Sequence, residues 1–221
     1  MEPESLNRES FDWVFLMITI SLAGMAWIRV SFPKRLEEFS TAFISNRFIN
    51  QITREENPFL NLSMVMLYIT YLINMSIFIY FVNSNYEFNE FLTNGIKSGL
   101  IIMVLLFTFD SLKLFFYWYS AFVFKTEPQT STHVLLLMLN RGALGLILAL
   151  LNLLIAYSGL NQTLLIITSI SLMAGFFVYR LIKSVPAYQK QGSFPLHYFI
   201  LYICTLEISP LLILGKYFTS V

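Results

Sequence analysis

The sequence predicts an all-α integral membrane protein with six transmembrane helices and an interfacial amphipathic helix between the first two. Three observations lead to this class. Of the 221 residues, 57% are hydrophobic and only 12% are charged, whereas soluble domains carry about 25% charged residues. The mean hydropathy is +0.67, so water could not solvate the whole surface, but a bilayer could cover it. The apolar residues also form six runs near the length of about 20 residues that a transmembrane helix needs. We expect one transmembrane domain over residues 1–221.

The first predicted span is Phe11–Val30, and the second is Pro58–Val82. Asn57 belongs to the residue types that cap helix N-termini, and Pro58 suits the first helical position, where its missing N–H is not needed. The chain starts with the acidic segment Met1–Ser5, which lacks the basic region of a secretory signal peptide. We therefore expect the first span to be retained.

The connection between these spans predicts a helix over about residues 33–54 that lies in the membrane interface. Its apolar residues recur at near-helical spacing, and charged residues stand between them. Such a helix places its apolar side in the acyl boundary and its charges toward water. The alternative is a docking surface for a cytoplasmic partner. The apolar positions are Leu36, Phe39, Phe43, Ile49 and Ile52.

Four further apolar runs complete the set. The third run is the longest, so its helix should tilt or protrude from the bilayer. The short connection Ser158–Asn161 makes the fourth and fifth spans an antiparallel hairpin. The four spans are Ile96–Phe124, Val134–Tyr157, Gln162–Ile182 and Pro195–Lys216.

Lysine and arginine residues beside the spans are unevenly distributed, and such residues favour the cytoplasmic side. One side has Arg29, Lys34, Arg35, Arg47, Arg54, Lys125, Arg180, Lys183 and Lys190, and the other has Arg8, Lys97 and Lys216. We therefore expect a multi-pass membrane protein with both termini outside the cytoplasm.

Five polar residues lie inside the predicted spans: Glu207, Lys113, Asp110, Arg141 and its neighbour Asn140. Charged groups at this depth are costly and usually have a partner. Counted from the cytoplasmic end at about 1.5 Å per residue, Lys113 lies at about 16 Å, Glu207 at about 18 Å and Asp110 at about 21 Å. Arg141 lies at about 10 Å by the same count.

These signs and depths suggest a polar centre between the third, fourth and sixth spans. In this hypothesis Glu207 pairs with Lys113 or Arg141. Asp110 takes the remaining cation, or neutralises Lys113 on its own helix. The network could simply fix helix packing, form a coupled proton or ion site, or bind a ligand or lipid headgroup.

Two further features concern helix shape and packing. Pro210 cannot donate to the carbonyl of Leu206, so the last helix should bend beside Glu207.

Small residues on one helix face allow close approach of a second helix. They form a stripe at Gly142, Gly145, Ala149, Asn152 and Ala156 on the fourth span and at Ser171 and Gly175 on the fifth.

Several functions are made improbable by what the sequence lacks. A net charge of +1 does not favour nucleic-acid binding, which needs a concentrated basic patch. Cys204 is the only cysteine, which excludes an intrachain disulfide and a thiolate metal cluster. His133 and His197 are the only histidines, and no zinc or nucleophile motif accompanies them. We expect no metal, no cofactor and no catalytic activity.

The run Tyr198–Tyr217, with its core Cys-Thr-Leu-Glu-Ile-Ser-Pro-Leu, resembles the closing motif of an uncharacterised family of bacterial polytopic inner-membrane proteins, the domain of unknown function 4271. The aromatic block Phe115–Phe124 and the dipeptide Asn140-Arg141 are similar to the middle section of that family. The resemblance implies a bacterial inner-membrane setting, in which both termini would lie in the periplasm, and a glutamate followed by a proline in the final helix. It implies no known activity.

Taken together, the sequence favours a non-catalytic subunit or scaffold of a cell-envelope complex, in contact with the lipid bilayer and with membrane-protein partners. The alternative is a small proton- or ion-coupled transporter or channel that uses the intramembrane charges. A transporter should show a wet cavity that reaches the charges, and a pseudo-repeat between its halves. A scaffold should show the charges sealed and paired.

Overall fold

The computed structural model of the protein describes residues 12–31, 62–86, 95–124, 127–159 and 161–189. Within these ranges all regular secondary structure is α-helical, as the sequence predicted. The helices are α1 (Asp12–Ser31), α4 (Leu62–Tyr86), α5 (Ile96–Phe124), α6 (Glu127–Tyr157) and α7 (Gln162–Gln189). Each of them contains a stretch long and apolar enough to cross a membrane. The chain is therefore a membrane protein of the all-α class.

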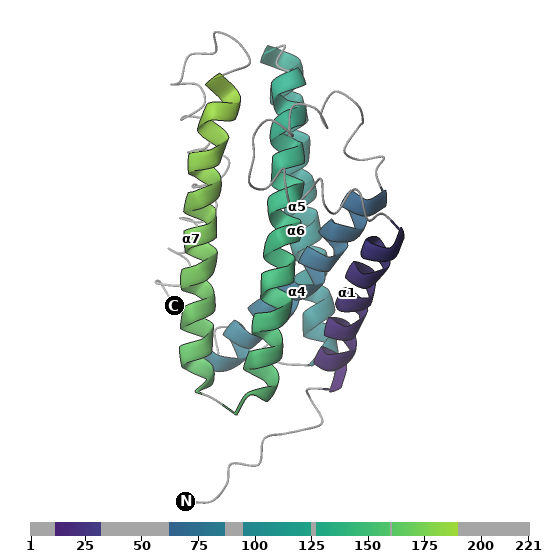
Figure 1. Ribbon diagram of the computed structural model, residues 1–221, viewed down its shortest axis with the longest axis vertical. Helices are drawn as coiled ribbons and strands as arrows, with labels where there is room; N and C mark the ends of the chain where they lie inside the picture. Colours follow the sequence, from purple (N-terminus) through teal and green to yellow (C-terminus); the bar gives the residue numbers. More distant parts are fainter. Residues whose placement is uncertain (1–11, 32–61, 87–94, 125–126, 160, 190–221) are drawn as a thin grey trace, which may run out of the picture.

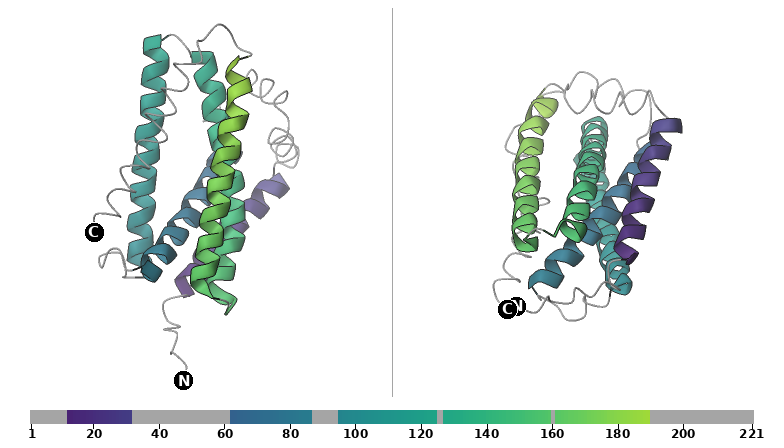
Figure 2. Two further views of the ribbon diagram at one scale, coloured as in Figure 1. Left: turned by 90° about the vertical axis from the view of Figure 1, so that its left-hand side faces the viewer. Right: turned by 60° about the horizontal axis from the view of Figure 1, so that its bottom comes forward.

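The interior helix of the bundle is α4, which packs against the other four described helices and most extensively against α6. Figure 1 shows α4 crossing obliquely behind α6, with α1 and α7 on opposite sides of the bundle. Both views in Figure 2 show α4 inclined to the nearly parallel α5, α6 and α7. In its apolar stretch 56% of the α4 residues are buried, against 17% for α5 and 11% for α7. The peripheral helices thus present most of their apolar side chains outward.

Buried apolar side chains form two clusters along the α4–α6 pair, separated by a middle layer. The first cluster includes Leu67 of α4 and Leu137 of α6, together with Tyr117 of α5. The second includes Ile77 of α4 and Leu148 of α6, and it also takes in residues of α1, α5 and α7. Between the clusters the facing turns of α4 and α6 carry polar side chains.

The close approach of α4 and α6 depends on two glycines of the predicted small-residue stripe. A Cβ atom added at Gly145 would lie 2.8 Å from the Cα of Tyr71, and one added at Gly142 would lie 3.0 Å from the side chain of Leu67. The first contact is with backbone, which cannot move aside. The second stripe behaves differently, because Gly175 has no described residue within 4 Å of such a Cβ.

The hairpin between α6 and α7 is built by local backbone chemistry. Gly159 has a φ of +61°, a left-handed conformation that glycine adopts without steric cost. Asn161 then accepts a hydrogen bond from the backbone N–H of Thr163 at 3.1 Å, as a helix N-cap does. The predicted antiparallel pairing of these two spans is therefore present, and α6 and α7 pack together.

Two helices continue beyond the predicted membrane spans. α6 begins at Glu127, before the predicted span at Val134, because the first turns of this helix are polar in sequence and lie outside the apolar run from which the span was predicted. α7 continues past Ile182 to Gln189, through Pro186, although a proline normally marks a helix end.

Other predictions lie outside the described residues. These are the interfacial helix over residues 33–54, the start of the second span at Pro58 and the sixth span, Pro195–Lys216.

Candidate functional site

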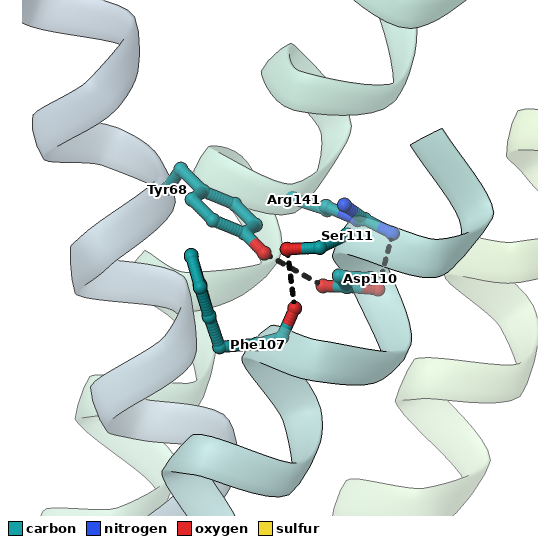
Figure 3. Close-up of polar contacts among 5 residues, drawn as sticks. All are labelled: Tyr68, Phe107, Asp110, Ser111 and Arg141. Atoms are coloured by element: carbon teal, nitrogen blue, oxygen red, sulfur yellow. Dashed lines mark hydrogen bonds and ion pairs between the residues drawn. The ribbon is translucent and has the colours of Figure 1, made fainter. Parts of the chain in front are cut away.

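The middle layer of the bundle contains an ion pair between two helices. Arg141 of α6 donates from Nη2 to Oδ1 of Asp110 of α5 at 2.6 Å. The two side chains are only 11% and 7% exposed. A charge-assisted hydrogen bond of this length is among the stronger polar contacts in proteins. Figure 3 shows the two groups facing each other from neighbouring helices.

Two tyrosines of α4 surround this pair. The hydroxyl of Tyr68 donates to Oδ2 of Asp110 at 3.2 Å (Figure 3). The guanidinium carbon of Arg141 lies 5.7 Å from the ring centres of both Tyr68 and Tyr71, within the range of cation–π attraction. Three helices therefore contribute to one closed polar group, in which the carboxylate and the guanidinium both have partners.

The predicted depths of the two charges differed by about 11 Å at 1.5 Å per residue, yet the residues are in direct contact. The start of the helix α6 at Glu127 removes the discrepancy. Arg141 lies fourteen residues after Glu127, and Asp110 lies fourteen residues before Phe124. Both are therefore about 21 Å from the ends of their helices on the same side.

The other predicted site residues are placed as follows. Lys113, one turn after Asp110, is partly exposed, and its ammonium lies 5.2 Å from the ring centre of Phe109. Asn140 is buried on α6 beside Arg141. Glu207 and Pro210 lie outside the described residues, so the pairing of Glu207 stays a prediction.

A second polar group links α1, α4 and α6. The sequence placed one of its members, Asn152, in the small-residue stripe but did not indicate a polar contact. The amide nitrogen of Asn74 donates to Ser21 Oγ of α1 at 3.0 Å, and that of Asn152 of α6 donates to the backbone oxygen of Asn74 at 2.8 Å. All three side chains are buried. The available signal was the spacing of Tyr68, Tyr71 and Asn74 on α4, which repeats every three residues and places polar groups on one face.

The chemistry of the site follows from these contacts. The charges of Asp110 and Arg141 neutralise each other between α5 and α6, and an apolar cluster lies on each side of the layer. In the described part of the chain, no three His, Cys, Asp or Glu side chains come together in a group that could hold a metal ion. The arrangement can fix the relative positions of α4, α5 and α6.

The comparisons with known proteins give one match. The model of a family described as a domain of unknown function (DUF4271) matches residues 14–218. This range includes almost all of α1 and the whole of the other described helices, as well as the motif near the C-terminus on which the resemblance was strongest. No curated protein and no solved structure matches the chain.

Proposed function

The chain belongs to the DUF4271 family, whose function is unknown, and we propose that it is a non-catalytic, multi-pass subunit or scaffold of a cell-envelope complex. In this proposal the intramembrane charges hold the helices in register. The outer helix faces meet the lipid bilayer and one or more membrane-protein partners.

The observation that carries the proposal is that Asp110 and Arg141 are buried and bonded to each other. Removing both charges from water has a large cost, which is offset only where the geometry is good and the remaining hydrogen bonds are made. Here the Tyr68 hydroxyl donates a hydrogen bond to the second carboxylate oxygen of Asp110. A moving ion would need to separate this pair, whereas a scaffold needs it to stay together.

The packing beside the pair supports the same reading. The backbone of Tyr71 lies so close to Gly145 that a single methyl group would not fit between them. This contact separates the ion pair from the Asn74–Asn152 group further along the same interface. Two polar groups divided by backbone contact do not provide a continuous path along α4 and α6.

The outer surface offers α5 and α7 as partner-binding helices. Along α5 the exposed side chains include Val104, Phe107, Phe115 and Phe122. Phe115 and Tyr119 stack with their ring centres 6.4 Å apart. Without a hydrophobic driving force in lipid, association through such a face would rely on packing and on interhelical hydrogen bonds.

The test is to identify what accompanies the protein in its own membrane. The full chain, carrying an affinity tag, is cross-linked in intact cells, extracted in mild detergent and analysed by mass spectrometry. We expect at least one membrane protein in near-stoichiometric amount, retained without cross-linker. A monodisperse monomer with no enriched companion in either preparation would overturn the proposal.

An ion-coupled transporter is the second candidate, favoured by one observation: a membrane-embedded carboxylate, Asp110, contacts a tyrosine hydroxyl and stands one turn from Lys113. Such sets also occur in proton relays. Proteoliposomes with an imposed pH gradient distinguish the two. A scaffold should dissipate the gradient no faster than empty liposomes, and Asp110→Asn should change nothing. A transporter should dissipate it in a manner that Asp110→Asn abolishes.

The proposed setting is the bacterial inner membrane, with both termini in the periplasm. The excess of lysine and arginine beside one set of loops supports this orientation. Alkaline phosphatase fused after Val221 should be active, because this reporter folds only in an oxidising compartment. An inactive but full-length fusion would reverse the orientation.

A further inference from the structure

The group formed by Ser21, Asn74 and Asn152 contains hydrogen-bonding capacity that the described residues do not use. Asn74 Nδ2 donates to Ser21 Oγ at 3.0 Å and to the backbone oxygen of Thr70 at 2.9 Å. Asn152 Nδ2 donates to the backbone oxygen of Asn74 at 2.8 Å. The two carboxamide oxygens are buried and have no hydrogen-bond donor among the described residues.

Rotating either amide by half a turn does not remove the problem. For Asn74 the rotation would bring Oδ1 against the oxygen of Thr70, and for Asn152 it would bring Oδ1 against the oxygen of Asn74. Each would replace a hydrogen bond by a contact between two acceptors. The observed orientations are therefore the ones that the surrounding acceptors require.

The nearby hydroxyl groups cannot supply the missing donors. Ser21 donates its proton to the backbone oxygen of Ile18 at 3.0 Å, and Thr70 donates to that of Met66 at 3.0 Å. Each hydroxyl has only one proton to donate. Among the described residues, the hydroxyls closest to the two carboxamide oxygens therefore leave them without a donor.

The position of the group in the membrane excludes bulk solvent as that source. Asn74 lies twelve residues from each end of α4, or about 18 Å at 1.5 Å per residue. At this depth lipid offers no hydrogen bonds, so polar groups must be satisfied inside the protein. Both asparagine side chains are fully buried.

Space remains beside Thr70, whose backbone oxygen accepts from Asn74. Gly24 lies one turn after Ser21 on α1. Among the described residues, a Cβ atom added at Gly24 would have a single neighbour within 4 Å, Thr70 Oγ1 at 3.9 Å. The missing side chain of Gly24 therefore leaves α1 and α4 loosely packed at Thr70, one turn from Asn74.

We propose that Asn74 and Asn152 form a binding site for internal water at the middle of the membrane, between α1, α4 and α6. Water supplies two O–H donors, and buried waters typically make about three hydrogen bonds to otherwise unsatisfied polar groups. A cation is a poorer occupant because its ligands here would be neutral. The Asp110 carboxylate is not a ligand of this site, because it is bonded to Tyr68. Tyr68 lies six residues before Asn74, or about 9 Å along α4 at 1.5 Å per residue.

Water-edited solid-state NMR of the wild-type protein in bilayers tests the site without altering it. Magnetisation is transferred from water to the side-chain carboxamide carbons, which are assigned with Asn74→Leu and Asn152→Leu. Leu148, on α6 one turn before Asn152, is equally buried and carries no polar group, so it serves as the dry control. We expect transfer to at least one of the two carboxamides to build up several-fold faster than transfer to Leu148.

Two results would overturn the proposal. Build-up at both asparagines that is as slow as at Leu148 would mean that the site is dry. Carboxamide signals that shift when sodium and potassium are replaced by a bulky organic cation would mean that it holds a metal ion. Rapid build-up that does not depend on the cation would support bound water.

Discussion

The charges of Asp110 and Arg141 are both buried, so each depends on the other for its stability. Removing one partner of a buried pair leaves the second charge without compensation, whereas removing both can be nearly neutral. The two residues also differ in what they can do alone. A lone carboxylate can take up a proton, but a lone guanidinium stays charged.

We therefore predict that Asp110→Leu lowers the free energy of unfolding by about 3–5 kcal/mol, and that Arg141→Leu lowers it by less. The double variant should recover most of the loss. Reversible unfolding in mixed detergent micelles measures all three. Ser111→Ala is the matched control, because Ser111 is exposed and bonds only the Phe107 carbonyl of its own helix (Figure 3). Additive losses in the double variant would show that the two charges are not energetically coupled.

Tyr68 contacts the pair in two ways that can be separated. Tyr68→Phe removes the hydroxyl that reaches Asp110 and retains the ring against Arg141, so we expect a loss of about 1 kcal/mol. Tyr68→Leu also removes the ring and should cost more. The same unfolding assay measures both variants. Equal stability of Tyr68→Phe and wild type would mean that the hydroxyl contributes nothing to holding the carboxylate.

The sequence indicated which residues were unusual and named Arg141 as one of two possible partners of Asp110, but it did not decide between the pairings. Asp110 and Arg141 stood out because they are charged in apolar runs. Their contact could not be derived, since it depends on which way each helix faces and on the start of α6 at Glu127. Tyr68 and Asn74 were missed because a tyrosine or an asparagine in a membrane helix is not unusual by composition. Their importance comes from the partners that packing brings to them.

Among the helices, the contact between α4 and α6 has the least tolerance for change. The predicted small-residue stripe contains glycines in two different situations. Gly145 touches the backbone of Tyr71, whereas Gly175 on α7 has open space around it within the described residues. Sequence spacing alone made the two positions look equivalent.

These two glycines give a matched pair of variants. Gly145→Ala forces α4 and α6 apart, so we predict a loss of about 1–3 kcal/mol, as is usual for overpacking. Gly175→Ala should be neutral or slightly stabilising, because alanine favours the helix by up to about 1 kcal/mol over glycine. Thermal midpoints in detergent compare them directly. A large loss at Gly175 would reveal a helix packed on that face of α7.

The positions of the helices were largely predictable, and their ends were not. Hydropathy located the spans that became α1, α4, α5, α6 and α7, because only apolar runs can face lipid. It could not detect the polar first turns of α6 after Glu127, nor the extension of α7 through Pro186. Both extensions are interrupted by polar residues in the sequence, so the continuous apolar run used to locate the spans is absent from them.

For the molecule as a whole, the partner of Glu207 determines where the sixth predicted span packs. Arg141 is bonded to Asp110, so among the cations proposed for Glu207 the hypothesis now favours Lys113. Their depths of about 16 and 18 Å at 1.5 Å per residue remain compatible with contact. This pairing would place the sixth predicted span, Pro195–Lys216, beside α5.

A double-mutant cycle tests the energetic part of this hypothesis. Glu207→Gln and Lys113→Gln should each destabilise the protein, and the double variant should lose less than the sum. For residues in contact the coupling energy is usually about 0.5–3 kcal/mol. Unfolding in mixed micelles measures it, with Lys97→Gln near the start of α5 as a control that should show no coupling to Glu207.

The geometric part can be tested with the native Cys204. It precedes Glu207 by three residues, and Phe116 follows Lys113 by three residues on α5. In antiparallel helices paired at Glu207 and Lys113, Cys204 and Phe116 would therefore face each other. We predict that Phe116→Cys forms a disulfide with Cys204 under a mild oxidant, seen by mass spectrometry of the monomer. Leu100→Cys is similarly exposed but lies sixteen residues, about 24 Å, farther along α5, too far for a disulfide. Cross-linking at position 100 without cross-linking at position 116 would place the sixth span in another register.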